Sequence, residues 1–467
     1  MPPSVALLLC LIFVYFLLRL ERTETPRLTR ALWIPTIWML TAAGKPLSIW
    51  LGQSGGDDLS GSPLDRFAQL GFLCLGLLLL SRRSFDWSAA AKDHVWLIVL
   101  VIYMLVSIFW SDIPYVSLKR WIRELIALVM SFVLLTEENP RYALECLLRR
   151  TIYIFIPFSL LLIRYYPEYG VQYGRWNGER MWVGFTVQKN GLGRLCLIAV
   201  FFLAWNLVTR YQKRGFSVAK YQTHADVIVL VMALWLLKGP PNSYPATAIA
   251  ALAAGLAVFM GLLLLRNRSL RMATAICGSA VICIAILGTA LPLATAGKTV
   301  TSGGLAGVLG RDETLTGRTD VWAALLPSFE KRSILGYGFG GFWTPSTQED
   351  AFGVKEAHNG YLDVCLGLGV VGALLTGLFL FSVFLQAKMA LASDFAWASF
   401  CICFLLMVEI HNLTESSIDS FQRNLMAIVL FLSVSLCEPL QRDHSERMHQ
   451  NHFRSKTDLK GQSQQTA

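Results

Sequence analysis

The sequence ATAIAALAAGLAVFMGLLLL, residues 246–265, decides the fold, because it contains no charged side chain over its whole length. It is followed by the basic segment RNRSLR, residues 266–271, and by a second apolar run at 272–296. About 20 consecutive apolar residues cross the hydrocarbon core of a bilayer as one helix. The pattern therefore predicts two transmembrane helices that meet at a basic connection.

Apolar runs of this kind recur along the whole chain. Of its 467 residues 54% are hydrophobic and 15% are charged, whereas a soluble globular domain carries about 25% charged residues. Thirteen candidate spans result, at residues 4–18, 31–51, 67–81, 95–110, 116–135, 151–163, 191–208, 225–237, 245–265, 272–296, 361–387, 395–411 and 424–437. The sequence predicts an all-α, polytopic transmembrane bundle of about 12–13 spans. It excludes a soluble enzyme with a membrane tail.

Basic residues are distributed unevenly among the connections between these runs. Alternate connections contain eighteen Lys and Arg residues in total, at 19–30, 82–92, 141–150, 210–220, 266–271 and 388. The intervening short connections contain none, at 52–65, 111–116 and 239–243. Under the positive-inside rule the basic set faces the cytoplasm, which explains the net charge of +10 without a nucleic-acid partner. The N-terminus then lies outside, and a disordered basic tail, 438–467, follows the membrane domain 1–437 in the cytoplasm.

Three polar connections lie on the opposite, outer side, at 164–190, 297–360 and 412–423. The second is longer than most connections between helices, and loops of that length are usually functional. It is rich in aromatic side chains, Trp322 among them, which disordered segments lack. We therefore expect an ordered, partly helical loop at the membrane surface rather than a disordered insertion, and we expect the chemistry on the outer face.

Cations also occur on this outer side, against the orientation rule. Lys119 and Arg120 stand at the outer end of one span, and Arg180, Lys189 and Arg318 lie in the outer loops. Arginine binds phosphate oxygens through two parallel N–H donors. The pattern indicates an anionic ligand at the outer membrane face. The alternative for Lys119 and Arg120 is that these long side chains extend to the membrane interface.

His358 lies where the long loop enters the next span, in EAHNGY, residues 356–361. A lone histidine is more often structural than catalytic, but imidazole readily accepts a proton near neutral pH, so we predict a catalytic or ligand-contacting role.

The nearby segment GYGFGG, residues 336–341, matches the residue pattern of the dinucleotide-binding fingerprint, but no predicted strand precedes it, so we do not interpret it as a nucleotide site. Its glycines instead predict a tight turn where backbone approaches a ligand or a helix end.

The order of these motifs resembles that of the O-antigen ligase and polymerase superfamily of bacterial envelopes, and most of all its exopolysaccharide polymerase branch. The motifs are SLKR at 117–120, QKNGLG at 188–193, LGRDETLTGRTDVW at 309–322, LGYGFGGFW at 335–343 and HNGYL at 358–362. Many ligases carry a Ser-Arg pair at the outer start of the span 245–265. This chain has PPNSYPAT at 240–247, without arginine, which fits the exopolysaccharide branch better.

The resemblance implies a metal-independent glycosyltransferase with its active site at the periplasmic face of the bacterial inner membrane. Such an enzyme moves a glycan from an undecaprenyl-pyrophosphate carrier to an acceptor glycan or lipid, with a chain-length regulator and a flippase as further partners. His358 and Arg318 would be the catalytic residues. His358 would orient or deprotonate the acceptor hydroxyl, and Arg318 would bind the pyrophosphate. Further pyrophosphate ligands would be Lys119, Arg120, Arg180 and Lys189. Supporting residues would be Asn190, Trp322, Gly336, Gly338, Asn359 and Tyr361.

Two other functions remain open at this point. A ligase performs the same chemistry but transfers the glycan to lipid A core, and a transporter moves the polysaccharide or its lipid carrier without altering it. Transporters often have repeated halves and charges near the bilayer midplane, whereas the charges here lie at the outer edge. No cofactor or metal is predicted, because the cysteines form no C-x-x-C pair and Asp312 beside Glu313 alone does not indicate a cation site.

Overall fold

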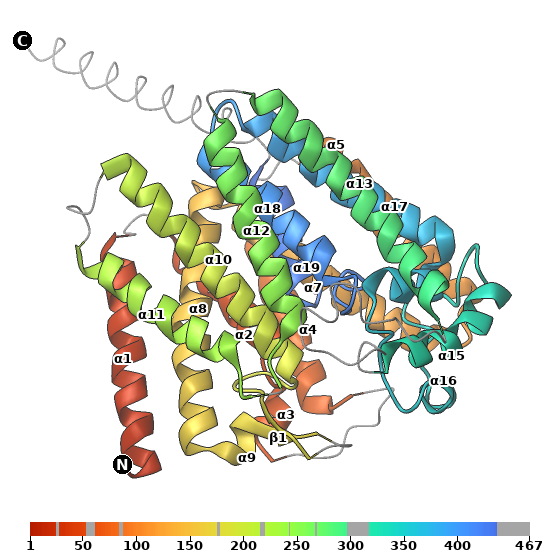
Figure 1. The fold of residues 1–467 in the computed structure, drawn as a ribbon, viewed down its shortest axis with the longest axis horizontal. Coiled ribbons are helices and arrows are strands. Elements are labelled where there is room, and N and C mark those ends of the chain that lie inside the picture. The colour runs from red at the N-terminus through yellow and green to blue at the C-terminus, as the bar shows by residue number, and fades with distance from the viewer. Residues whose placement is uncertain are drawn as a thin grey trace, which may run out of the picture.

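The computed structural model describes residues 1–24, 28–52, 61–83, 87–174, 178–214, 220–241, 243–266, 269–296 and 317–436. This part of the chain is a bundle of helices (Figure 1). The α-helices are α1 (Pro3–Glu24), α2 (Trp33–Ala43), α3 (Leu47–Trp50), α4 (Pro63–Ser81), α5 (Trp87–Asp93), α6 (Val95–Val106), α7 (Pro114–Leu135), α8 (Pro140–Tyr165), α9 (Pro167–Gly170), α10 (Lys189–Arg214), α11 (Lys220–Lys238), α12 (Ala246–Leu265), α13 (Leu270–Thr295), α15 (Arg318–Lys331), α16 (Pro345–Asp350), α17 (Gly360–Ala390), α18 (Phe395–His411) and α19 (Asn424–Ser435).

Two 3₁₀ helices and one small sheet complete the described elements. The 3₁₀ helices are η1 (Arg30–Leu32) and η2 (Ser107–Trp110). Strands β1 (Val171–Tyr173) and β2 (Arg180–Trp182) form an antiparallel hairpin, in which Val171 pairs with Trp182 and Tyr173 pairs with Arg180.

Each of the thirteen predicted apolar runs falls on a helix, which confirms the all-α, multi-pass membrane architecture. Seven described helices are long and apolar enough to cross a bilayer, namely α1, α4, α8, α10, α12, α13 and α17, and three shorter apolar helices accompany them. Two predicted connections were wrong, because residue 388 lies inside α17 and residues 141–150 lie inside α8. Their charges gave the appearance of a loop, but Arg149 and Arg150 pair inside the bundle with Asp226 and Glu21.

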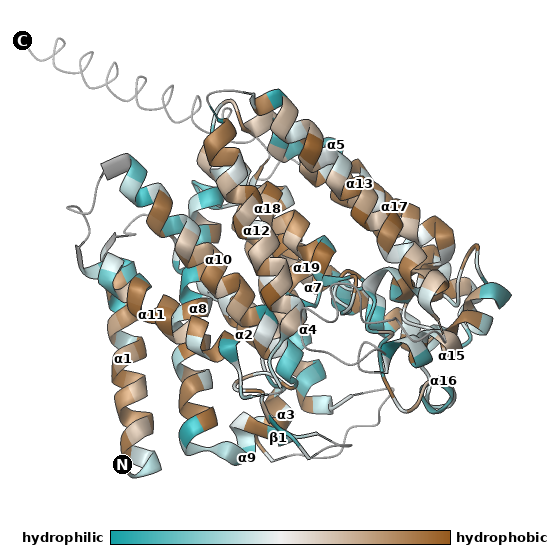
Figure 2. Ribbon diagram, viewed as in Figure 1, coloured by the Kyte–Doolittle hydropathy of each residue, from teal (hydrophilic) through white to brown (hydrophobic). Residues whose placement is uncertain are grey.

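The centre of the bundle is formed by α18 and α19, in which nearly every side chain is buried. Aromatic rings join α18 to α10: the Phe400 ring lies 5.3 Å from Phe201 and 4.8 Å from Trp205. Helices α1 and α4 lie at the periphery and leave most of their apolar side chains uncovered. Figure 2 shows hydrophobic residues over the middle of α1 and more polar residues toward its ends, as expected of a helix that faces lipid.

The polar connections are gathered at two ends of the bundle (Figure 1). The N-terminus, α9, β1 and α16 lie toward the lower end, and the ends of α12 and α13 that flank the basic segment 266–271 lie at the upper end. This separation agrees with the alternation of basic and uncharged connections in the sequence. Which end faces the cytoplasm stays a prediction.

The described part of the long loop, 317–360, packs against α17. Trp322, fully buried, forms a small core with Leu325 and Phe342, and Leu362 and Leu366 of α17 complete it. Residues 309–316 of the first loop motif, with Asp312 and Glu313, lie outside the described residues, as does the tail 438–467. The aromatic side chains that argued against a disordered insertion are thus the ones that hold this loop to the bundle.

Helix α17 is interrupted at Gly369, whose φ is +67° and ψ −172°. The loop fills the interruption: the Val370 amide donates to the Ser333 carbonyl at 2.8 Å, and the Tyr337 amide donates to the Leu366 carbonyl at 3.0 Å. A broken helix at membrane depth is tolerated when other protein groups satisfy the freed backbone. The turn that contains Gly336 and Gly338 therefore lies against a helix break, one of the two alternatives that its glycines predicted.

Candidate functional site

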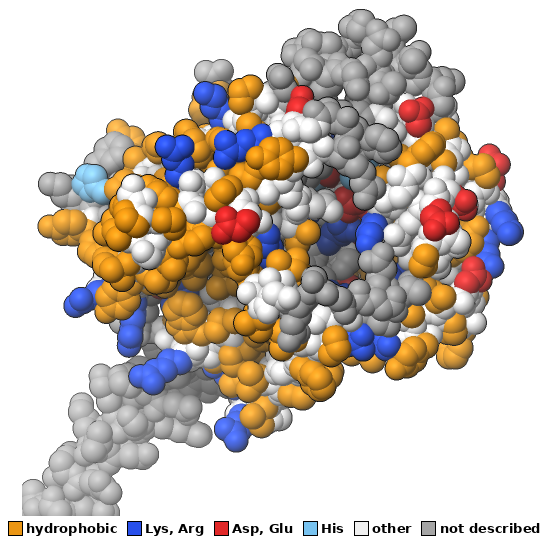
Figure 3. Space-filling view, turned by 90° about the horizontal axis from the view of Figure 1, so that it is seen from below, with side chains coloured by type: hydrophobic (Ala, Val, Ile, Leu, Met, Phe, Trp, Pro, Cys, Tyr) orange, Lys and Arg blue, Asp and Glu red, His pale blue; other side chains and the backbone are white. Residues whose placement is uncertain are grey.

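Four segments that are distant in the sequence converge at one point on the lower side of the bundle. They are the first turn of α10, the first turn of α15, the segment 356–359 before α17, and the polar connection 412–423 between α18 and α19. Figure 3, seen from below, shows basic and acidic side chains close together in a recess of this face. The contacts of these four segments define what we call the Glu415 cluster: Asn190, Arg318, Glu356, His358, Glu415 and Arg423.

Glu415 is the centre of the cluster. Its side chain is 2% exposed, and its Oε1 accepts hydrogen bonds from Arg318 and, at 2.7 Å, from Asn190 Nδ2. An isolated buried carboxylate is costly, but one that is paired and hydrogen-bonded is tolerated. Glu415 therefore ties the first turns of α10 and α15 to the connection after α18.

His358 stands next to this carboxylate. Its Nδ1 lies 3.9 Å from Glu415 Oε2 and 3.5 Å from Glu356 Oε1. Both Nδ1 and Glu415 Oε2 are buried and have no hydrogen-bond partner among the described residues. The imidazole as a whole is 25% exposed, against 8% for the Arg318 side chain. His358 therefore offers more surface to a ligand than Arg318 does, and about as much as Arg423, which is 27% exposed.

The backbone of His358 is held in a left-handed conformation, with φ +52°. Such a conformation costs about 1–3 kcal/mol and persists only where the surroundings enforce it. Both neighbours are fixed: the Ala357 amide donates to the Asp363 carboxylate at 3.0 Å, and the Asn359 side chain caps α17 by accepting from the Leu362 amide at 2.8 Å. The hydrogen bonds of Ala357 and Asn359 thereby fix the backbone on both sides of His358 and with it the position of the His358 ring.

Glu356 forms the opposite edge of the cluster. Its Oε2 accepts from Arg423 Nη1 at 2.7 Å, and Arg423 Nε lies 3.0 Å from Asp419. Burial alone would raise the pKa of the Glu356 carboxyl, but Arg423 and His358 outweigh it and hold that pKa below its usual range. Burial acts against the Arg423 charge as well, but Asp419 and Glu356 raise the pKa of the guanidinium above its usual range. Glu356 and Arg423 are therefore both charged at neutral pH.

Three predicted supporting residues build the frame of the cluster. Trp322 Nε1 donates to the Ala357 carbonyl at 2.9 Å, so α15 is fastened to the residue before His358. The fully buried Asn359 also donates to the Gly288 and Leu413 carbonyls, at 3.1 and 3.0 Å. Tyr361 donates from its hydroxyl to the Glu409 carbonyl at 3.2 Å. These bonds join α13, α15 and α18 around the start of α17.

The remaining predicted cations do not enter the Glu415 cluster. Arg120 donates to the Gly340 carbonyl, and the Lys119 ammonium lies 4.0 Å from the centre of the Tyr115 ring. Arg180 is exposed on β2, in a hairpin that Figure 1 places apart from α15. Lys189, next to Asn190, lies 3.4 Å from Ser243 Oγ. Of the four, Lys189 is the one next in sequence to a member of the cluster.

The sequence reasoning missed Glu415 and Arg423, and it named Glu356 only as a neighbour of His358. A signal was present: these charges lie in the polar connection 412–423 and at its partner segment, next to apolar spans, where ionisable groups tend to mark function. Arg194, one turn into α10, was missed as well; its Nη1 donates to the Ser416 carbonyl at 3.4 Å. The contacts of Glu415, Arg423 and Arg194 become visible only in the tertiary structure, which brings the four segments together.

The cluster has to be tested as a metal site, because Glu356, His358 and Glu415 each offer a ligand atom within 4.8 Å of the others. Two carboxylates and an imidazole are common metal ligands. Here, however, the other oxygen of each carboxylate already binds a guanidinium, from Arg423 and Arg318. A divalent cation would lie beside two fixed positive charges, whereas an N–H group at Nδ1 faces the two carboxylates without adding a second full charge to the site. The donor set therefore fits a protonated nitrogen better than a metal ion.

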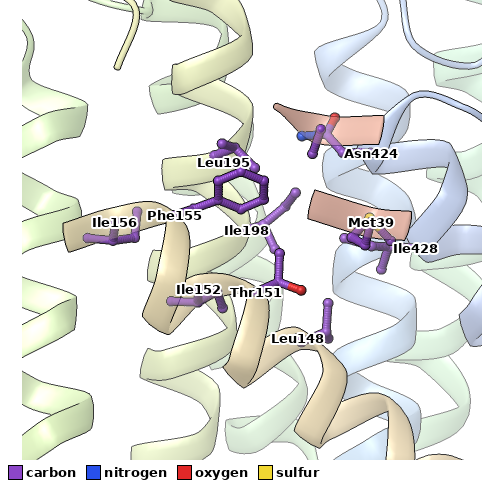
Figure 4. A pocket seen from close by; sticks show the side chains of 11 residues that line it. Met39, Leu148, Thr151, Ile152, Phe155, Ile156, Leu195, Ile198, Asn424 and Ile428 are labelled. Atoms are coloured by element: carbon purple, nitrogen blue, oxygen red, sulfur yellow. The ribbon is translucent and has the colours of Figure 1, made fainter. Parts of the chain in front are cut away.

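A separate cavity inside the bundle has no such chemistry. It measures about 20 Å³ and is lined mostly by apolar side chains of α2, α8, α10 and α19, among them Met39, Phe155 and Ile428 (Figure 4). Thr151 and Asn424 are its polar residues. A cavity of this size holds about one water molecule. It is a packing void and not a substrate site.

Comparisons with known proteins agree with the resemblance that the sequence motifs suggested. Residues 231–377 match the family model described as O-Antigen ligase, and this range contains Arg318 and His358. The chain is 24% identical over 348 residues to the exopolysaccharide production protein ExoQ of Rhizobium meliloti (strain 1021), which corresponds to 70% of this chain and 74% of that protein. These findings confirm the resemblance to the O-antigen ligase family and its exopolysaccharide branch, and they support a membrane glycan polymerase or ligase.

Proposed function

We propose that this chain, a multi-pass membrane protein that resembles the O-antigen ligase family, is an inner-membrane glycan polymerase of exopolysaccharide or O-antigen synthesis. It transfers oligosaccharide from an undecaprenyl-pyrophosphate carrier to a hydroxyl of an acceptor sugar at the periplasmic face. One observation carries the proposal: Arg318 and His358, forty residues apart in the sequence, meet at the buried carboxylate of Glu415.

The reaction forms one bond and breaks one. The oxygen of the acceptor hydroxyl bonds to the anomeric carbon of the donor, and the bond from that carbon to the pyrophosphate oxygen breaks. The hydroxyl proton passes to the enzyme, and undecaprenyl pyrophosphate leaves with the bonding electrons. Because pyrophosphate is already a stable anion, stabilising its growing charge is a larger requirement than protonating it.

His358 is suited to receive the proton. The two carboxylates that face Nδ1 favour a proton on that nitrogen, which leaves Nε2 with a lone pair. In a catalytic triad a carboxylate orients the imidazole through a hydrogen bond to Nδ1; here the two carboxylates lie 3.5 and 3.9 Å from Nδ1, and we propose that Glu415 takes this role when substrate binds. General-base catalysis of this kind contributes about 10²–10⁴-fold to the rate.

Arg318 is suited to bind the pyrophosphate. A guanidinium has five N–H donors, and its contact with Glu415 is made through Nη2. Among the residues that the structure describes, the rest of the fork has no partner, and we propose that it binds phosphate oxygens, to which arginine binds bidentately. Lys189, next in sequence to Asn190, is a further candidate ligand for the pyrophosphate. We assign Glu415 a positioning role, because it orients the base and the arginine at once.

Substitution of the two catalytic residues tests this function. Purified protein with carrier-linked repeat units should yield longer glycan, and His358→Ala or Arg318→Ala should abolish the product while the amount of protein in the membrane stays normal. The control is Lys355→Ala, in the same outer loop and outside the cluster. Normal amounts of long polymer from either variant would show that its assigned role is wrong.

The ligase alternative is kept because the matched family model is described as O-Antigen ligase. The two enzymes share the chemistry and differ in the acceptor, which is carrier-linked glycan for a polymerase and lipid A core for a ligase. A deletion strain separates them on gels. Loss of a polymerase leaves single repeat units, whereas loss of a ligase leaves carrier-linked chains.

A further inference from the structure

A second cavity, much larger than the packing void, opens between α1, α2 and α8. It has a volume of about 560 Å³, within the range of small-molecule sites, about 300–1,000 Å³. Most of its wall is apolar, with Leu7 from α1, Leu40 from α2, and Leu161 and Leu162 from α8. The chemistry of this wall suits a hydrocarbon chain.

One end of this cavity is lined by aromatic rings of the kind found at membrane interfaces. The Trp50 ring stacks on Tyr169 at 5.7 Å between ring centres and lies 5.0 Å from the Phe185 ring, and all three line the cavity. Trp and Tyr gather at the headgroup level of membranes. The aromatic end therefore lies at headgroup depth, on the side that carries α9 and the β hairpin (Figure 1).

Lys45 is the charged residue in the described lining of this cavity. It is 7% exposed, and its Nζ donates to the Gly184 carbonyl at 2.7 Å and to the Thr186 carbonyl at 2.5 Å. An ammonium has three N–H donors, so these two bonds leave one for an anionic oxygen. A cation at the interface end of an apolar cavity complements a lipid that has a phosphate at its head.

The cavity is also joined to the Glu415 cluster by a short stretch of chain. Phe185 is five residues before Asn190, and five residues reach at most about 18 Å. Lys45 holds the carbonyls on both sides of Phe185, and Asn190 holds Glu415. A lipid in the cavity therefore has its head within reach of the cluster, but on different residues from those assigned to the pyrophosphate of the donor.

We propose that this cavity binds the polyprenyl chain of a second carrier lipid, whose phosphate faces Lys45 and which carries the acceptor glycan. The proposal rests on the proposed function. In that reaction the donor is attacked at the sugar next to its own pyrophosphate, whereas the acceptor reacts through a hydroxyl remote from its lipid. The acceptor's lipid must therefore be held at a distance from Arg318, as the Lys45 cavity provides.

Photo-crosslinking tests the lipid site without relying on catalysis. The full-length protein in phosphatidylcholine nanodiscs is irradiated with a diazirine-bearing polyprenyl phosphate, and labelled peptides are identified by mass spectrometry. We expect labels on α1, α8 or residues 183–188, displaced by unlabelled polyprenyl phosphate and not by phosphatidylglycerol. Absence of labels from all three of these segments overturns the proposal, and equal displacement by phosphatidylglycerol identifies an ordinary phospholipid site and overturns it as well.

Three variants make the test specific. Leu40→Trp narrows the cavity and should weaken labelling by about tenfold, which corresponds to about 1.4 kcal/mol of binding free energy. Ile37→Trp, exposed on the same helix α2 and outside the cavity lining, should have no effect. Arg318→Ala should retain full labelling, since loss there would mean that the donor site had been labelled.

The same experiment separates the failure of this inference from the failure of the proposed function. Labelling that persists in a preparation without glycan transfer supports the lipid site and counts against the proposed function. Glycan transfer that proceeds normally in Leu40→Trp, with unchanged KM for the carrier-linked acceptor, overturns the inference and leaves the proposed function intact.

Discussion

At the scale of single residues, the site depends on the Glu415 carboxylate, whose two oxygens contact different partners. Glu415 Oε1 binds Arg318 and Asn190, and Oε2 faces His358 Nδ1. Hydrogen bonds to charged groups are worth about 1.5–3 kcal/mol each, and their loss leaves buried partners unpaired. The Glu415 cluster should therefore be more sensitive to the charge of Glu415 than to its volume.

Glu415→Gln tests this sensitivity. The amide keeps the size and one acceptor for Asn190, but it removes the charge that orients His358 and Arg318. We expect kcat to fall by about 10²-fold, the lower part of the range for a disabled general base, while the protein still purifies as a folded monodisperse species.

The matched control is Glu349→Gln, the same change at an exposed position of α16 in the same outer loop. A second readout separates positioning from mere support: Glu415→Asp keeps the charge and should recover part of the kcat that Glu415→Gln loses. Wild-type turnover in Glu415→Gln would remove Glu415 from the mechanism.

Removal of divalent cations is the second residue-scale test. Because Arg318 and Arg423 each hold one oxygen of the two carboxylates, we expect the rate of glycan transfer to be unchanged after EDTA treatment and buffer exchange. The measurement is turnover before and after treatment, with metal content checked by mass spectrometry. A loss of activity that one added cation restores would assign Glu356, His358 and Glu415 to a metal.

At the scale of elements, the interruption of α17 positions the outer loop. An added Cβ at Gly369 would lie 2.1 Å from the Ile334 carbonyl oxygen, in a backbone conformation with φ +67°. Residues other than glycine rarely adopt that region. The break therefore requires glycine, and the loop residues 333–337 supply the hydrogen bonds that the helix loses there.

Gly369→Ala is expected to destabilise the protein by about 2–4 kcal/mol, from backbone strain together with the displacement of the loop. Thermal unfolding in detergent measures the effect. The control is Gly377→Ala in the same helix, where an added Cβ meets nothing within 4 Å. That variant should unfold at or slightly above the wild-type temperature, since alanine favours helix. Equal melting of the two variants would contradict the assigned role of Gly369.

At the scale of the whole molecule, the orientation of the bundle is the property to be tested. Loop charge predicts that α16 faces the periplasm and the end of α10 faces the cytoplasm. Ser346→Cys, exposed on α16, should react with an impermeant maleimide in intact spheroplasts. Gln212→Cys, exposed at the end of α10, should react only after permeabilisation. The wild-type chain gives the background from native cysteines, and the reverse pattern would invert the topology and remove the periplasmic site.

Much of the fold could be predicted because a bilayer imposes a simple rule on sequence. Every backbone group must be satisfied within the membrane, so apolar runs become helices, and all thirteen runs did. The error at 141–150 arose because charges can be paired inside a bundle, as Arg150 is with Glu21. Such pairing depends on a partner more than a hundred residues away and leaves no local pattern.

The candidate site was predicted in part. Arg318, His358 and Asn190 were chosen from separate motifs, and the structure brings them around Glu415. Arg120 and Arg180 were chosen for the same charge but lie elsewhere, on Gly340 and on an exposed strand. Charge type alone does not distinguish a ligand-binding arginine from one that fastens a loop.

The sequence by itself determined the helical membrane architecture, the uneven distribution of charge across its connections, and the placement of His358 and Arg318 in one long polar connection, 297–360. These properties are local, because hydropathy, helix length and loop charge are read over about twenty residues at a time. Only the tertiary structure decided that Glu415 joins them and that α1, α2 and α8 enclose a separate apolar cavity of about 560 Å³. Both features arise from helices distant in sequence, and the packing that brings them together is a property of the whole chain.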